Sequence, residues 1–169
     1  MFACQSWAST YDHLLLRAQA SIFPKIVLLD KHLDKKSTDD VINISIVHKE
    51  KDAYIAQQLL SSIKDKYGDN LGTKKLLVTF NSFDDIDKNS PATAYIVLQG
   101  SGKELKKAIS FASTNNRIVF SYSYTDFKHN ALISLYVKEK TYIYLNKSAV
   151  QLYDIRFLPM FYKLTKIIE

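Results

Sequence analysis

The 169-residue chain has one cysteine, few arginines and no long apolar run, and each of these features excludes a class of protein. Cys4 alone cannot form an internal disulfide. No apolar stretch approaches the roughly 18 residues of a membrane-spanning helix, so we expect none. The net charge is +6, yet almost all the cations are lysines, whereas bases and phosphates are contacted mainly through arginine. This composition favours a solvated cationic surface over nucleic-acid binding and leaves open weak attraction to an anionic membrane or an acidic partner.

A glycine-containing segment, Gly100 to Lys103, resembles part of a phosphate-binding loop, but the full motif is absent. Val97 stands where the first glycine is required, and Glu104 replaces the Ser or Thr that would hold magnesium. Ser101 and Glu104 have the spacing of a capping box instead, so we expect them to satisfy the first N–H groups of a helix. Binding of an anion at that helix N-terminus stays an alternative.

Metal-binding patterns are also incomplete. Asp85, Asp87 and Asn89 have the opening spacing of a calcium loop, but Ser90 replaces its glycine and Ile96 its bidentate glutamate. The histidines lack the paired spacing of a zinc site; they are His13, His32, His48 and His129. We expect no metal and no cofactor.

The serines give no better indication of catalysis. Ser121 and Ser123 end an expected strand near Asp126, but neither is enclosed by the glycines of a nucleophile elbow. His129 is too close in sequence to be a persuasive general base. The sequence therefore predicts a protein that is not an enzyme.

The chain length fits one domain, and we assign it to residues 10–169. Residues 1–9 are interpreted as the remnant of an export signal or a disordered N-terminus. Ser6 to Ala8 has the small-x-small form of a signal-peptidase site, and Met1 to Cys4 would also fit the end of a lipoprotein signal. An ordinary frayed terminus explains these residues equally well.

Hydrophobic periodicity predicts alternating strands and helices. A long amphipathic helix is expected over Tyr11 to Leu33, interrupted by Pro24, and Asp52 is expected to cap a second helix that ends at Gly68. The remaining expected elements are strands over 41–47, 75–80, 94–98 and 117–121, and a helix over 101–115. The predicted fold class is α/β, with a mostly parallel sheet covered by helices on both faces.

The last forty residues form a distinct pattern. Alternating residues 132–137, a polar turn at Lys138 to Lys140 and an aromatic run over Thr141 to Leu145 predict a β-hairpin. Helical spacing follows it, with Pro159 suited to a helix start. Three residues of this tail are expected to cover the hairpin in the core; they are Phe161, Leu164 and Ile168.

This C-terminal pattern resembles the signature of the YfiR-like family, mainly over Phe127 to Glu169. The resemblance rests on an apolar strand with Ile133 and Leu135, the charged turn, an aromatic strand that ends in Asn146, and a closing helix containing Leu164. It departs from the family where Asn130-Ala131 replaces a glycine, and the cysteine pairs of some members are absent.

The resemblance implies a periplasmic, non-enzymatic regulator or sensor domain. Proteins of this family hold a membrane-bound signalling protein in check, typically a diguanylate cyclase, and related domains serve histidine kinases. We therefore expect such a partner, with a homodimer as a further possibility. The alternative is a periplasmic protein that binds a small solute.

Two sets of residues are candidates for binding. Parallel sheets bind ligands beyond the carboxyl ends of their strands, and uncharged polar groups follow those ends here. The candidate ligand-binding residues are His48, Asn81, Gln99, Ser101, Ser123 and Tyr124. For a partner, Leu14 and Phe23 would widen the apolar stripe of the first helix beyond what the core needs, unless both simply complete the core.

Overall fold

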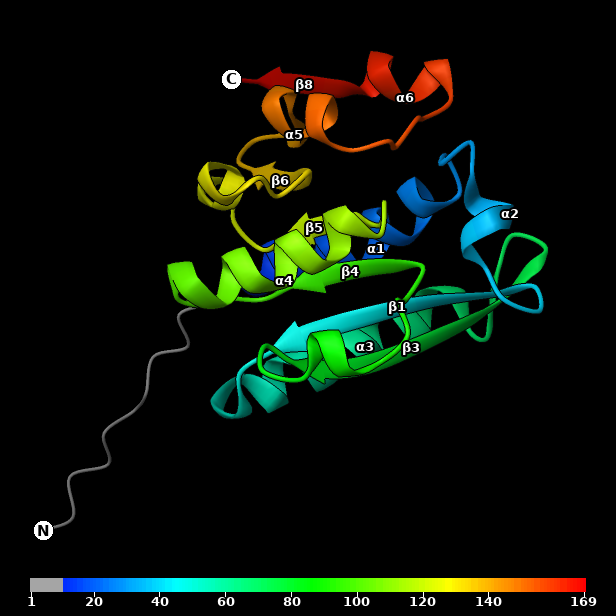
Figure 1. Cartoon of the computed structure of the whole chain (residues 1–169), viewed down its shortest axis with the longest axis vertical. Coiled ribbons are helices and arrows are strands. Elements are labelled where there is room, and N and C mark those ends of the chain that lie inside the picture. The colour runs from blue at the N-terminus through cyan, green and yellow to red at the C-terminus, as the bar shows by residue number, and fades with distance from the viewer. Residues whose placement is uncertain (1–10) are drawn as a thin grey trace, which may run out of the picture.

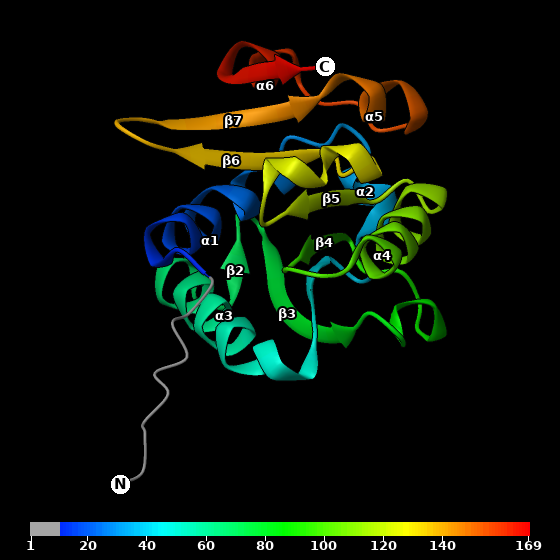
Figure 2. The same ribbon diagram turned by 90° about the vertical axis from the view of Figure 1, so that its left-hand side faces the viewer.

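The computed structural model describes residues 11–169, so Cys4, the suspected signal-peptidase site and the predicted remnant 1–9 lie outside the described part. One eight-stranded sheet has the order β2-β3-β1-β4-β5-β6-β7-β8 (Figures 1 and 2). Its strands are β1 (Val41–His48), β2 (Asn70–Leu71), β3 (Lys74–Ser82), β4 (Ala94–Val97), β5 (Ile118–Ser121), β6 (Ile133–Val137), β7 (Thr141–Asn146) and β8 (Thr165–Ile168). Strands β3, β1, β4, β5 and β6 are parallel, which confirms the predicted fold class.

Helices cover both faces of this sheet. Figure 2 shows α1 and α3 on one side and α4 on the other. The α-helices are α1 (His13–Val27), α2 (Leu33–Lys36), α3 (Ala53–Tyr67), α4 (Gly102–Thr114), α5 (Lys147–Leu152) and α6 (Pro159–Leu164). Short 3-10 helices are η1 (Glu50–Asp52), η2 (Ile86–Lys88) and η3 (Tyr124–His129).

Local sequence signals place several of these elements. The central strand β1 is buried on both faces, and five of its eight residues are Val or Ile, as suits a strand covered by two helix layers. Gly68 ends α3 with a φ of 62°, which L side chains rarely adopt. At the start of α4, Ser101 Oγ accepts from the Glu104 N–H, and the Glu104 carboxylate accepts from the Ser101 N–H. The predicted capping box is confirmed.

The N-terminal helix is shorter than predicted and is turned about its axis. It ends at Val27 rather than Leu33, with Pro24 in its last turn, and α2 is a separate element. Phe23, which the sequence left open between a partner contact and the core, is fully buried and stacks on Phe120 at 4.3 Å between ring centroids. Leu14 is 67% exposed. Of the two candidate partner residues, only Leu14 can reach a partner.

The predicted hairpin is confirmed by the antiparallel pairing of β6 with β7, but the tail after it differs from the prediction. Residues 165–168 form a strand, β8, parallel to β7, in place of a continuing helix. Phe161 is fully buried as predicted, whereas Leu164 is 59% exposed and does not cover the hairpin. Ile168, on an edge strand, is only half-buried.

Phe161→Ala should therefore cost about 3 to 5 kcal/mol of unfolding free energy, because its ring fills the contact with Phe157 at 4.2 Å. Leu164→Ala is the matched control and should change the unfolding free energy by less than about 0.5 kcal/mol, because this side chain is already in water. Urea unfolding of both variants checks this. Equal losses would show that the tail packs differently.

Candidate functional site

In open α/β sheets the ligand crevice lies where the strand order reverses, and here the order reverses between β1 and β4. The chain leaves β1 through α3 to reach β3 on one side, and the next parallel strand, β4, pairs on the other side of β1. Open α/β sheets bind ligands at such a reversal, outside the carboxyl ends of the strands.

In this protein the first described residue occupies that crevice. The Tyr11 side chain is buried, and its hydroxyl donates to Asp52 Oδ2 at 3.0 Å and accepts from the Gln99 N–H at 2.9 Å. Burial raises the pKa of Tyr11 well above its usual value, although the Gln99 N–H opposes that rise. Asp52 was expected to cap α3, but it makes no side-chain capping bond there, and its carboxylate accepts from Tyr11 instead.

The start of α1 is also fixed to the end of β5. The Tyr122 hydroxyl accepts from the Asp12 N–H at 2.7 Å, and Gln19 Nε2 donates to the Tyr122 carbonyl at 2.9 Å. The rings of Tyr11 and Tyr122 meet edge to face at 4.8 Å. The chain itself thus supplies the groups that a ligand would contact here.

The predicted ligand-binding residues follow the strand ends, but most of them bond to near neighbours. His48 Nδ1 lies 2.7 Å from the Lys49 carbonyl oxygen, and its ring meets Phe80 edge-on. Asn81 Nδ2 donates to Ser45 Oγ at 2.8 Å. Gln99 is half-buried beside Tyr11, and Ser101 is the exposed helix cap described above.

Ser123 and Tyr124 share a cavity. Its volume is about 200 Å³, and it lies between the start of α1 and strand β6. It is lined by Asp12, Leu15, Tyr122, Ser123, Tyr124, Leu135, Tyr136 and Val137. The six predicted residues therefore do not surround one site, and their role in binding a ligand stays a prediction.

One carboxyl group near this cavity has an unusual pKa. Asp126 in η3 is buried, and desolvation raises its pKa from 3.8 to about 6, against the stabilising Ser123 backbone N–H. Its ionisation is thus moved close to neutral pH. Within residues 11–169, no group of three or more His, Cys, Asp or Glu side chains is placed to hold a metal ion.

A different surface concentrates exposed apolar side chains. Helix α6 with its preceding residue, together with β8, carries five large apolar residues that are 39% to 59% exposed. We call them the C-terminal apolar surface: Leu158, Met160, Tyr162, Leu164 and Ile167. In Figure 1, α6 and β8 form one end of the molecule. Large exposed apolar patches on a protein mark interaction sites.

The margin of this surface is hollowed. A cavity of about 140 Å³ opens between α5, α6 and β8, and Lys147 and Gln151 are the polar residues of its lining. Tyr162 and Ile167 of the C-terminal apolar surface line it, together with Leu145 and Val150. Such a hollow can receive one apolar side chain of a partner.

The face of the sheet opposite to Ile167 carries tyrosine side chains of β6 and β7. Tyr136 and Tyr144 stack at 5.7 Å with their rings 9° apart, and Tyr124 meets both rings edge-on. Lys166 Nζ lies 5.8 Å from the centre of the Tyr142 ring and 6.0 Å from that of Tyr144. Neighbouring residues of a strand point to opposite faces of the sheet. Lys166 therefore lies on the face with the tyrosines, and Ile167 lies on the face of the C-terminal apolar surface.

Comparisons with known proteins identify a fold and no family. No family model and no curated protein matches the chain. Among solved structures, a conserved domain protein from Vibrio cholerae O1 biovar eltor matches with a TM-score of 0.61 and 13% identity, over 91% of this chain and 60% of that one. The ABC domain in complex with L-Trp from Streptococcus pneumonia matches with a TM-score of 0.61 and 9% identity, over 92% and 62%. The chain thus spans under two thirds of each neighbour, and the likeness shows an α/β fold alone.

The raised pKa of Asp126 predicts a stability that depends on pH. The folded protein holds the proton of this carboxyl up to about pH 6, and the unfolded chain releases it near pH 4, so stability falls as the pH rises through this window. Asp126→Asn should be more stable than the wild type above pH 6 and lose that advantage below pH 4. Urea unfolding at pH 4 and pH 7.5 measures the difference, and an equal difference at both values would contradict the assignment.

Proposed function

We propose that this protein is a non-enzymatic regulator that binds the extracytoplasmic part of a membrane-bound signalling protein through its C-terminal apolar surface. The observation that carries the proposal is the exposure of five large apolar side chains within ten residues of sequence. The resemblance to YfiR-like proteins supplies the class of partner, a diguanylate cyclase or a histidine kinase, and the periplasmic location.

The surface also indicates the chemistry of the partner. Lys163 is exposed beside the apolar residues, whereas the acidic Glu169 is already paired with Lys147. A partner with an apolar centre and an acidic rim therefore complements it, since rim charges steer association and select partners. Binding would bias the signalling protein by the difference in affinity for its two states.

The start of α1 is a weaker candidate for this contact. Phe23 is inside the core, which leaves Leu14 as the exposed member of the predicted pair. The cavity near Leu14, of about 390 Å³ between α1 and α3, is lined mainly by polar side chains such as Arg17, Gln57 and Ser61. It lacks the apolar centre of a protein interface.

A second candidate function is the binding of a small solute. The fold similarity to a domain in complex with L-Trp favours it, as does the cavity beside Ser123 and Tyr124. Titration calorimetry with L-tryptophan separates the two proposals. Saturable binding that Tyr124→Ala removes would favour the solute-binding protein.

Leu164→Asp should abolish binding to the extracytoplasmic domain of the membrane diguanylate cyclase or histidine kinase that is the proposed partner, because it places a charge in the centre of the apolar surface. Leu14→Asp is the matched control, being 67% exposed against 59% for Leu164, and should bind like the wild type. Surface plasmon resonance with that purified domain measures both affinities. Circular dichroism melts verify that both variants fold.

The opposite result, loss of binding in Leu14→Asp alone, would move the contact to α1. Unchanged binding in both variants would exclude both surfaces. If the signalling protein is held inactive by this contact, Leu164→Asp in cells should also raise its output, whereas Leu14→Asp should not.

A further inference from the structure

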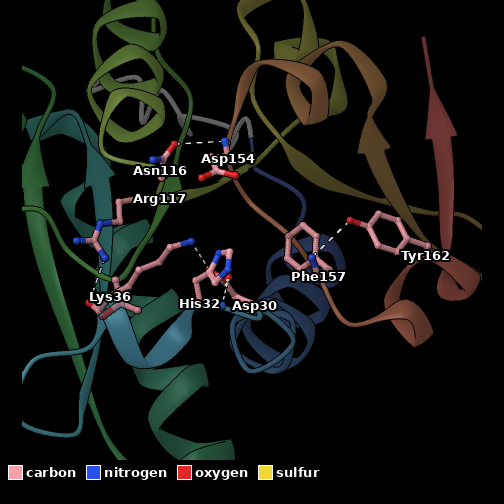
Figure 3. A network of polar contacts seen from close by, with 9 residues as sticks. Asp30, His32, Lys36, Asn116, Arg117, Asp154, Phe157 and Tyr162 are labelled. Atoms are coloured by element: carbon pink, nitrogen blue, oxygen red, sulfur yellow. Dashed lines mark hydrogen bonds and ion pairs between the residues drawn. The ribbon is translucent and has the colours of Figure 1, made fainter.

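A polar pocket lies at the end of the sheet opposite to the strand-end crevice, and sequence periodicity gave no indication of it. Its volume is about 470 Å³. Three separate segments form it: the region of α2 before β1, the turn between α4 and β5, and residues 154–156 (Figure 3). We call it the amino-end pocket; it is lined by His32, Lys35, Lys36, Asn115, Asn116, Arg117, Asp154 and Arg156.

The lining of this pocket is rich in cations. Only three arginines occur in the sequence, and two of them, Arg117 and Arg156, line the pocket. Lys35 and Lys36 add two further positive charges, and Asp154 is the one acidic side chain of the lining. Arginine is the residue best suited to hold an oxyanion, because its planar fork can donate two parallel hydrogen bonds.

One of these cations is neutralised from within. Lys36 Nζ lies 2.5 Å from Asp30 Oδ2, and the two side chains are 7% and 2% exposed. The other carboxylate oxygen of Asp30 accepts from the His32 N–H at 2.9 Å. The pocket has four cationic side chains and two nearby carboxylates, Asp30 and Asp154. Its net charge is therefore +2.

Arg117 is held in place with part of its donor set unused. One terminal nitrogen, Nη1, donates to the Lys36 carbonyl at 3.1 Å, which fixes the guanidinium at the pocket wall. Its Nε is buried and has no hydrogen-bond partner within residues 11–169. Burial lowers the pKa of Arg117, and the nearby Asp30 carboxylate opposes that shift.

In the neighbouring turn, Asn115 Nδ2 donates to the Phe111 carbonyl at 2.8 Å, whereas Asn116 is bonded through its amide oxygen. The last carbonyls of α4 already accept from the backbone N–H groups of Asn115, Asn116 and Arg117, so the negative end of the helix dipole is capped. The side-chain oxygen of Asn116 accepts from the Asp154 N–H at 3.3 Å. Its NH₂ group is thus the part of the amide that can contact a ligand.

From this arrangement we infer that the amino-end pocket binds a phosphate dianion, either free or as the headgroup of a phosphate monoester. A phosphate monoester carries a charge of about −1.5 to −2 at neutral pH, which matches the net +2 of the pocket. Its oxygens would accept from the guanidinium groups of Arg117 and Arg156, of which the latter lies 3.9 Å from Asp154 Oδ1 through its Nε. This site is separate from the C-terminal apolar surface and does not depend on the proposed function.

Isothermal titration calorimetry of the protein with inorganic phosphate, and separately with glycerol 3-phosphate, tests the inference. Saturable binding is expected, and Arg156→Gln should weaken it by about tenfold or more, because a charge-assisted hydrogen bond is lost. Arg156 is 72% exposed at its side chain, and its carbonyl, which accepts from the Lys31 N–H, is retained in the variant, so the fold should persist. Tighter binding of the ester would identify a phosphorylated metabolite as the source.

Two further variants complete the test. Arg117→Lys keeps the charge but removes the planar fork, and it should also weaken phosphate binding. Arg17→Gln removes the third arginine, which lies on α1 away from the pocket, and should bind phosphate like the wild type. Three results would each overturn the inference. The first is the absence of saturable binding of either phosphate compound up to about 10 mM. The others are tighter binding of succinate than of phosphate, and equal phosphate affinities of Arg156→Gln and the wild type.

Discussion

The packing of α1 against β5 and β6 is the contact on which the rest of the structure depends. Phe23 stacks on Phe120 at full burial, so the first helix is anchored to the middle of the sheet. The same contact brings Tyr11 into the crevice beyond β1 and β4, where its hydroxyl joins Asp52 to Gln99. One helix thus completes the core and fills the usual ligand site of this architecture. Large apolar side chains are exposed instead in the tail beyond β7.

Sequence patterns predicted the elements that local chemistry controls. The β-branched run of β1, the Ser101–Glu104 capping box and the hairpin of β6 and β7 each depend on residues close in sequence, and all three are present. The alternation of strands and helices was sufficient for the α/β class because a parallel strand pair needs a long crossover. These features could be predicted without tertiary information.

The wrong predictions arise where more than one face of a helix, or more than one type of element, would bury a similar number of apolar residues. Three consecutive leucines, Leu14 to Leu16, allow the buried stripe of α1 to be placed one residue too early, which left Phe23 open between the surface and the core. In the tail, Met160, Leu164 and Ile167 fit helical spacing, but pairing with β7 makes residues 165–168 an edge strand. The amino-end pocket joins Arg117 to Lys36 and Arg156, which are far apart in sequence. Only the fold brings such residues together.

The central claim is that the C-terminal apolar surface is the site of partner contact. Amide hydrogen exchange, followed by mass spectrometry with and without the extracytoplasmic domain of the partner, tests it most directly. The account predicts slowed exchange over residues 158–168 when the domain is bound, with little change in α1. Protection confined to residues 13–27, or none over α6 and β8 under saturating partner, would contradict it.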